Sequence, residues 1–159
     1  SHEMTTTFPC IPLPDEDATL ELGRRLGLGA VPGAVLHLHG DLGAGKTTLV
    51  RGLLRALGHA GRVKSPTYAL VEAYALSSLS LYHFDFYRFD TPTELRDSGL
   101  LEHFGGTDIC LVEWPEKAGS QLPVPDLAIT LETTPDGGRS AAVTAHTDRG
   151  AQWARDALK

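Results

Sequence analysis

The sequence predicts an α/β fold in which helices pack on the faces of a sheet that mixes parallel and antiparallel strands. Three observations support this fold class. Residues 34–39 form an apolar, β-rich run that ends at a glycine-rich segment, residues 40–45. Leucines then recur at every fourth position, as on the buried face of a helix. Further along the chain, β-rich runs occur in pairs separated by turn residues, which is typical of hairpins.

Two helices are predicted around this first strand. Residues 15–27 carry apolar residues at helical spacing, and Asp15 precedes an acidic first turn, as an N-cap residue does. The second helix follows the glycine-rich segment and ends at Gly58, because glycine commonly terminates helices. The order strand, loop, helix is therefore expected for residues 34–58.

The rest of the chain is predicted to add a hairpin, a buried strand, a second hairpin and two helices. Residues 69–75 and 80–86 flank a Ser-Ser turn, and residues 127–131 and 141–145 flank a Pro-Asp-Gly-Gly turn. Between them, residues 109–112 are continuously apolar, like a strand buried on both faces. One short helix should begin at a capping box of Thr91, Pro92 and Glu94, and a last helix is expected from Ala151.

The composition indicates one domain and narrows the class of protein. The chain has 159 residues, of which 42% are hydrophobic, and no run approaches the roughly 18 apolar residues that cross a membrane. Residues 1–4 resemble the remnant of an expression tag. A net charge of −6 disfavours a broad nucleic-acid-binding surface. Cys10 and Cys110 form no C-x-x-C pair, so we expect a reduced, cytoplasmic protein.

Residues 40–47 match the phosphate-binding pattern G-x-x-x-x-G-K-[ST] between a predicted strand and a predicted helix, as that pattern requires. Glycines let backbone N–H groups point at bound phosphates, together with the positive end of the helix. Lys46 adds a positive charge for the outer phosphates, and the Thr47 hydroxyl can bind Mg²⁺. The motif predicts a P-loop NTPase-like three-layer fold, with residues 5–159 as a single P-loop nucleotide-binding domain.

A nucleotide-hydrolysing site also needs a carboxylate for Mg²⁺ and a group that orients the attacking water. Two acids end β-rich runs, Asp85 after residues 81–84 and Glu113 after residues 109–112. Because ligands bind at the carboxyl ends of strands in such sheets, both carboxylates are candidates for this site. For Glu113, a solvated strand end is the alternative.

Four segments, in this order, closely resemble the bacterial TsaE (YjeE) family. They are residues 40–48, Lys64-Ser65-Pro66-Thr67-Tyr68, His83-Phe84-Asp85-Phe86-Tyr87-Arg88 and Leu111-Val112-Glu113-Trp114-Pro115. The similarity covers about residues 15–126, whereas residues 127–159 carry no informative motif.

The resemblance implies an ATPase that is needed to form N6-threonylcarbamoyladenosine, the modified base beside the anticodon in tRNAs that read codons beginning with A. Proteins of this family work with TsaB and TsaD. TsaD transfers the threonylcarbamoyl group, TsaB is its dimer partner, and ATP hydrolysis by TsaE permits repeated turnover. The tRNA would be reached mainly through this complex, and hydrolysis by the isolated chain should be slow. ATP is favoured over GTP by this resemblance and by the absence of an N-K-x-D element.

The family's site residues carry over motif by motif. By this resemblance, Asp85 holds the Mg²⁺ shell, Glu113 positions or activates water, and Thr67 is a switch-like threonine that senses the outer phosphate. The implied metal ligands are Thr47, Asp85 and Glu113, and the implied catalytic residues are Glu113, Asp85 and Lys46. The implied nucleotide-binding residues are Asp41, Leu42, Gly43, Ala44, Gly45, Lys46, Thr47, Thr48, Thr67 and Trp114.

Some residues have two interpretations. Trp114 either covers the nucleotide or a partner surface, or packs in the core. Arg88 either supplies a cation to the transferring phosphate or forms a surface ion pair. Thr67 lies either in a nucleotide-sensing loop or in a plain turn. His37 and His39, two apart on one strand, suit either a metal pair or ordinary packing.

Two other functions are compatible with a P-loop domain of this size. One is a small-molecule kinase, although residues 116–126 contain no arginine-rich lid segment. The other is a nucleotide-gated binding module, in which ATP changes the affinity for a partner and hydrolysis resets it.

Overall fold

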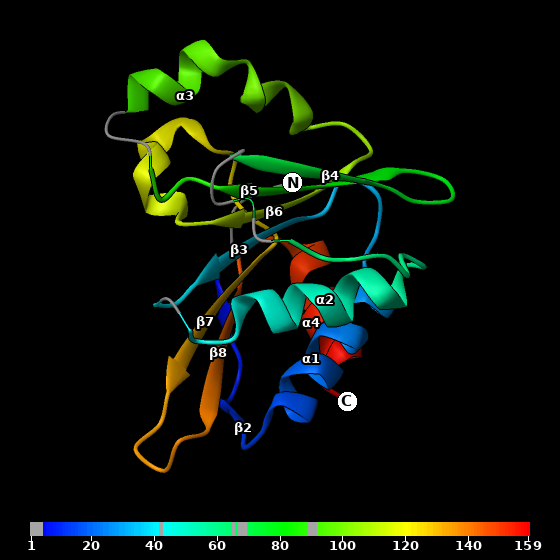
Figure 1. The fold of residues 1–159 in the computed structure, drawn as a ribbon, viewed down its shortest axis with the longest axis vertical. Helices are drawn as coiled ribbons and strands as arrows, with labels where there is room; N and C mark the ends of the chain where they lie inside the picture. The colour runs from blue at the N-terminus through cyan, green and yellow to red at the C-terminus, as the bar shows by residue number, and fades with distance from the viewer. Residues whose placement is uncertain (1–4, 42, 65, 67–69, 89–91) are drawn as a thin grey trace.

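The structure of the chain is a computed structural model that describes residues 5–41, 43–64, 66, 70–88 and 92–159 (Figure 1). Its helices and strands follow one another in the order β1 (Thr6–Thr7), β2 (Ile11–Leu13), α1 (Glu16–Gly29), β3 (Val35–His39), α2 (Lys46–Ala56), β4 (Val71–Ala75), β5 (Ser80–Asp85), α3 (Pro92–Ser98), the 3-10 helix η1 (Leu100–His103), β6 (Ile109–Glu113), the 3-10 helix η2 (Pro115–Gln121), β7 (Leu127–Thr133), β8 (Arg139–Ala145) and α4 (Asp148–Ala157).

The described strands form one sheet in the order β1-β8-β7-β3-β6-β5-β4, with β2 also paired to β8. The four central strands, β7, β3, β6 and β5, are parallel. Antiparallel strands β8 and β4 flank them through the β7–β8 and β4–β5 hairpins. The sheet of mixed direction is therefore confirmed, and β3, which leads into the glycine loop, lies at its centre.

Helices cover both faces of the sheet (Figure 1). The helices α1, α2 and α4 lie on one face, where α1 packs against both of the others. Leu36 and Leu38 of β3 belong to the core on that side. Val35 belongs to a second core on the opposite side, where Leu95 of α3 and Ala118 of η2 are also buried. The three-layer α/β architecture predicted from the sequence is thus confirmed.

Helix α2 is held against α1 by glycines at the points of closest approach. A Cβ atom on Gly52 would lie 2.3 Å from the backbone oxygen of Leu20, and one on Gly23 would lie 2.1 Å from that of Leu49. Real Cβ atoms do not approach other atoms this closely, so each backbone fits against the other only where a side chain is missing. This packing fixes the position of the helix that begins at the glycine loop.

The start of β3 is anchored by a buried carboxylate. Asp126 accepts hydrogen bonds from the Val35 N–H at 2.9 Å, from the Thr147 hydroxyl at 2.6 Å and from the Arg149 guanidinium at 2.9 and 3.0 Å. Burial alone would raise the pKa of Asp126, but these donors together hold it below the ordinary value. One residue thereby links β3, the approach to β7 and the first turn of α4.

Several element boundaries differ from the sequence prediction. Helix α4 begins at Asp148 rather than Ala151, because the Thr147 side chain caps it by accepting from the Gly150 N–H. The predicted helix at residues 15–27 continues to Gly29. Strands β1 and β2, and the 3-10 helices η1 and η2, were not predicted, since pieces of two to seven residues carry too little periodicity.

The two histidines of β3 lie beside each other, and among the described residues they belong to no group of three or more side chains that could hold a metal ion. Their ring centroids are 6.5 Å apart, His37 is only 8% exposed, and the Nδ1 atom of His39 lies 3.6 Å from a carboxylate oxygen of Glu116. No group of three or more His, Cys, Asp or Glu side chains within the described ranges is arranged to hold a metal ion. No described helix is both long and apolar enough to cross a membrane.

Acidification should destabilise the fold through His37. Burial, together with the nearby His39 and His146, lowers the pKa of His37 to about 4 from an ordinary 6.5. The unfolded chain therefore binds a proton below pH 6.5, whereas the folded chain resists it until about pH 4, so stability falls as the pH drops through this window. The loss attributable to His37 between pH 7.5 and pH 5 should be about 2 kcal/mol.

Urea unfolding of wild type and His37→Leu at both pH values measures this effect. The variant should lose less stability on acidification than the wild type, by about that amount. An equal loss in wild type and His37→Leu would contradict the prediction.

Candidate functional site

The glycine loop joins the end of β3 to the first residue of α2. Gly40 and Gly45 have φ angles of 147° and 101°, which side chains disfavour. A Cβ atom on Gly40 would also lie 2.7 Å from the backbone oxygen of Leu131 in β7. The backbone therefore bends between sheet and helix in a way that glycine alone allows without strain.

The N-terminus of α2 differs from that of α1 in its charge. Helix α1 begins with the capping side chain of Asp15 and has two acidic residues in its first turn. Helix α2 has Gly45 at its N-cap, which has no side chain to cap it, and begins with Lys46, Thr47 and Thr48. The N–H groups of its first turn and the positive end of its dipole thus favour an external anion.

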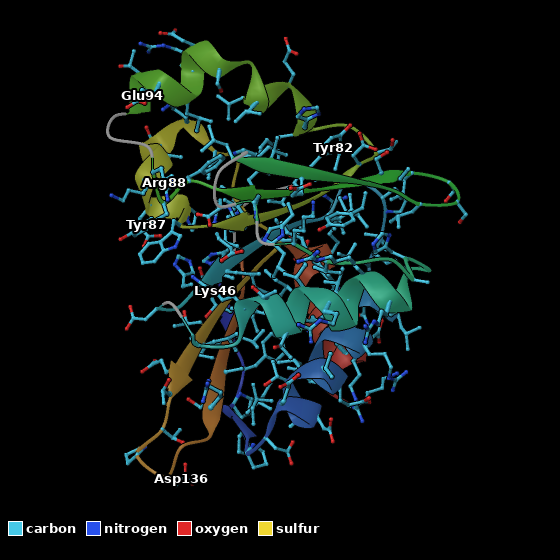
Figure 2. All side chains as sticks on the ribbon, in the orientation of Figure 1. Lys46, Tyr82, Tyr87, Arg88, Glu94 and Asp136 are labelled. Carbon is cyan, nitrogen blue, oxygen red and sulfur yellow. The ribbon has the colours of Figure 1, made fainter. Side chains whose placement is uncertain are left out.

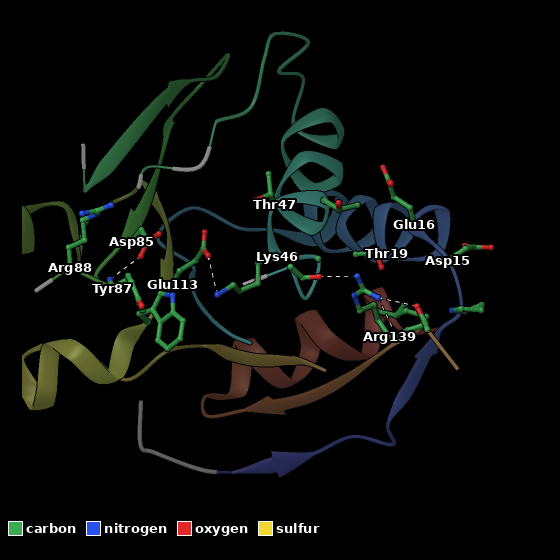
Figure 3. A pocket seen from close by; sticks show the side chains of 18 residues that line it. Asp15, Glu16, Thr19, Lys46, Thr47, Asp85, Tyr87, Arg88, Glu113 and Arg139 are labelled. Carbon is green, nitrogen blue, oxygen red and sulfur yellow. Dashed lines mark hydrogen bonds and ion pairs between the residues drawn. The ribbon is translucent and has the colours of Figure 1, made fainter. Parts of the chain in front are cut away.

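A cavity of about 610 Å³ opens at this helix end (Figure 3). It is bounded by the glycine loop, by the ends of β5 and β6, and by the start of α1 with the β7–β8 hairpin. Its lining residues are Leu13, Pro14, Asp15, Glu16, Thr19, Gly43, Gly45, Lys46, Thr47, Thr48, Asp85, Tyr87, Arg88, Glu113, Trp114, Gly137, Gly138 and Arg139.

Strand pairing brings the two candidate carboxylates together. Asp85 is the last residue of β5 and Glu113 the last of β6, and they are directly paired in the parallel register. Leu38 of β3 pairs with Glu113 from the other side. Glu113 shares its sheet face with Ile109 and Leu111, which belong to the core beneath α1 and α2. The carboxylates therefore project on the side where α2 begins.

Lys46 lies between the loop and these strand ends, at the start of α2 in Figure 2. Its ammonium donates to the Gly40 carbonyl at 2.5 Å and lies 3.4 Å from the Oε1 atom of Glu113. It also lies 4.7 Å from the ring centroid of Trp114. The Gly40 carbonyl, Glu113 and Trp114 thus hold the ammonium at the cavity wall. The Lys46 side chain is only 6% exposed.

Glu113 is a buried carboxylate with two cationic or hydrogen-bonding neighbours. Burial alone would raise its pKa, but the His83 ring at 2.6 Å and the Lys46 ammonium outweigh burial and hold the pKa below its ordinary value. Glu113 is therefore ionised at neutral pH even though it is 4% exposed. An ionised, water-poor carboxylate at a cavity wall can accept a proton or orient a bound water.

The pKa of Asp85 is shifted in the opposite direction from that of Glu113. Burial raises its pKa above the ordinary value and the Glu113 charge adds to this, although the Tyr87 N–H donates to its Oδ1 atom at 2.9 Å. Two neighbouring carboxylates at one cavity wall favour the binding of a cation.

An aromatic pair borders the cavity beside the carboxylates. The rings of Tyr87 and Trp114 have centroids 4.9 Å apart, and Tyr87 is 47% exposed. Trp114 has a left-handed backbone, with φ of 56°, directly after β6. This turn lets Trp114 line the cavity while also packing against the second core. The packing interpretation therefore describes its position, and its role as a cover for a nucleotide or a partner surface stays a prediction.

Most of the site residues proposed from the sequence meet at this cavity: Gly43, Gly45, Lys46, Thr47, Thr48, Asp85, Glu113 and Trp114. Among the described residues of the loop, exposed Asp41 and buried Ala44 lie outside the cavity lining. Leu42 and Thr67 lie outside the described residues, so their proposed roles stay predictions. Arg88 lines the cavity.

Two residues with contacts in the site were not identified from the sequence. His83 received no role, although its place two residues before Asp85 on a strand put it on the same sheet face. Arg139 donates to the Gly43 carbonyl at 2.9 Å and so ties the β7–β8 hairpin to the loop. No local pattern marks Arg139, because its partner is 96 residues away.

Comparisons with known proteins show the family of the chain. Residues 13–141 match the family model described as threonylcarbamoyl adenosine biosynthesis protein TsaE, which extends the resemblance beyond residue 126 to include Arg139. The chain is 42% identical to the Haemophilus influenzae tRNA threonylcarbamoyladenosine biosynthesis protein TsaE, over 87% of this chain and 90% of the relative. It is 43% identical to the Bacillus subtilis protein of the same name, over 76% and 75%.

The fold comparison gives the same result. The crystal structure of Bacillus subtilis YdiB superimposes with a TM-score of 0.83 at 32% identity, covering 99% of this chain and 97% of that chain. The similarity in sequence and in fold thus extends over most of the chain. The chain belongs to the TsaE family of threonylcarbamoyl adenosine biosynthesis proteins.

Proposed function

We propose that this chain is a Mg²⁺-dependent ATPase required to form N6-threonylcarbamoyladenosine in tRNAs that read codons beginning with A. The observation that carries the proposal is the meeting, in one cavity, of the glycine loop, Lys46 and the carboxylates of Asp85 and Glu113. The family supplies the pathway, since relatives along most of the chain carry the name tRNA threonylcarbamoyladenosine biosynthesis protein.

The triphosphate of ATP is proposed to bind at the N-terminus of α2. The first-turn N–H groups, the helix dipole and the Lys46 ammonium provide complementary positive charge there. ATP is favoured over other nucleotides by the family resemblance and by the absence of an N-K-x-D element from the sequence.

The residues present fit Mg²⁺. This ion prefers oxygen ligands and is commonly held by one or two carboxylates together with substrate phosphates. The Thr47 hydroxyl and the Asp85 and Glu113 carboxylates line the cavity and meet this description. Bound Mg²⁺ neutralises charge on phosphate oxygens. In this proposal the carboxylates of Asp85 and Glu113 both hold the ion. Glu113 also orients the attacking water.

Partners are proposed to complete the site. A P-loop site gains speed when a partner supplies a further cation or orders the nucleotide pocket. The half-exposed Tyr87 beside Trp114 provides an aromatic border suited to a protein contact. We therefore propose slow hydrolysis by the isolated chain and stimulation by TsaB and TsaD, with tRNA reached through that complex in the cytoplasm.

Replacement of Glu113 by glutamine should separate ATP hydrolysis from ATP binding. The amide has nearly the same shape but cannot accept a proton, so ATP hydrolysis should fall by about a hundredfold while ATP binding is retained. Hydrolysis is followed by phosphate release and binding by calorimetry. Glu116→Gln, on the adjacent η2 with a side chain 55% exposed, is the control and should keep wild-type turnover.

Removal of Mg²⁺ by EDTA should abolish hydrolysis by the wild type under the same conditions.

Wild-type turnover in the Glu113→Gln variant would show that Glu113 takes no part in hydrolysis. Binding of Mg-ATP without any hydrolysis by wild type would favour a nucleotide-gated binding module.

Addition of TsaB and TsaD should raise the rate of ATP hydrolysis by about tenfold or more, because a completed site stabilises the transition state better. The Lys46→Ala variant, mixed with the same partners, controls for contaminating ATPases and should show no stimulation. Equal rates with and without the partners would contradict the proposed stimulation.

The pathway is tested in cells depleted of this chain. Threonylcarbamoyladenosine in their tRNA, measured by nucleoside mass spectrometry, should fall and should be restored by wild type but not by Glu113→Gln. An unchanged level of the modified nucleoside after depletion would overturn the assignment to tRNA modification. Restoration by Glu113→Gln would separate the modification from ATP hydrolysis.

A further inference from the structure

We propose that His83 is a positioning residue for Glu113: its ring fixes one carboxylate oxygen so that the other faces Lys46 and the cavity. This inference rests on the proposed ATPase function and assigns the residue that prepares its water-orienting carboxylate.

The contact between the two side chains is short and fully enclosed. The Nε2 atom of His83 lies 2.6 Å from the Oε2 atom of Glu113, and His83 is 0% exposed. The strands carrying them, β5 and β6, are adjacent and parallel, with His83 paired to Leu111, two residues before Glu113. The sheet itself therefore holds the ring beneath the carboxylate.

The direction of this hydrogen bond follows from the chemistry of the two groups. An ionised carboxylate only accepts, so the Nε2 atom of His83 carries the proton and donates it. In the part of the chain that the structure describes, the Nδ1 atom of His83 has no hydrogen-bond partner. Burying an imidazole costs free energy unless its polar atoms are paired, so a purely packing role would be served as well by an apolar side chain. The Glu113 contact is what the imidazole adds.

The geometry assigns different tasks to the two oxygens of Glu113. The Oε2 atom is held by His83, and the Oε1 atom lies 3.4 Å from the Lys46 ammonium at the cavity wall. The terminal torsion of a glutamate is broad, so without His83 the carboxylate can rotate and present either oxygen, or both, to Lys46. Misplacement of a catalytic group by about 1 Å can cost a hundredfold in rate.

The test compares His83→Leu with His83→Gln in the presence of TsaB and TsaD. In His83→Leu, kcat for ATP hydrolysis should fall by about tenfold or more, while KM for Mg-ATP changes by less than about twofold, because phosphate binding uses other groups. In His83→Gln, the side-chain amide can donate from nearly the position of Nε2 and should restore part of kcat.

His37→Leu is the matched control. His37 is also a buried strand histidine, but it shares a sheet face with Val35, opposite to the face that carries Glu113. It has no described contact with Glu113. Its substitution should leave kcat within about twofold of wild type. Thermal unfolding of every variant establishes that each is folded; if His83→Leu does not fold, His83→Asn replaces it, because the shorter amide cannot reach Glu113.

Combination with Glu113→Gln separates positioning from general damage. If His83 acts through Glu113, adding His83→Leu to Glu113→Gln should change kcat by less than about twofold, since the group that it positions is already lost. A full tenfold further loss, or a wild-type kcat in the folded His83→Leu variant, would overturn the inference. Failure of the wild type to hydrolyse ATP would instead overturn the proposed function.

Discussion

The site depends on the parallel pairing of β3, β6 and β5. Parallel strands place their carboxyl ends at one edge of the sheet, so the glycine loop after β3 lies beside the last residues of β5 and β6. The register pairs Asp85 directly with Glu113. A shift of one residue in either strand would turn its carboxylate to the opposite face, away from α2. Strand register therefore determines the chemistry of the cavity.

This arrangement brings ionisable groups together where water is scarce, and each depends on its neighbours. Glu113 keeps its charge because His83 and Lys46 offset the cost of burial. Lys46 in turn is held by the Gly40 carbonyl and Glu113, whereas Asp85, with weaker compensation, has a raised pKa. Adjacent carboxylates whose pKa values are shifted in opposite directions are typical of functional sites.

The sequence was sufficient for the longer helices and strands and for many of the residues that line the cavity, but not for their spatial order. The glycine loop, Lys46 and the strand-ending acids Asp85 and Glu113 were predicted because each follows from local periodicity or a short motif. The placement of β7 beside β3 could not be predicted, since strand order arises from contacts between distant residues. Arg139 and the Asp126–Arg149 pair escaped prediction for the same reason, because their partners lie elsewhere in the chain.

The long-range contacts explain how a loop rich in glycine is held in place. Glycine lowers the backbone strain of the bend. It also gives the unfolded chain more conformational entropy, which is lost on folding. The structure offsets this from three directions: α1 packs closely on α2 at Gly23 and Gly52, Asp126 fixes the start of β3, and Arg139 holds the Gly43 carbonyl. A phosphate-binding loop needs its N–H groups preoriented, since ordering them on binding would reduce affinity. The tail that carried no motif in the sequence therefore supports the loop.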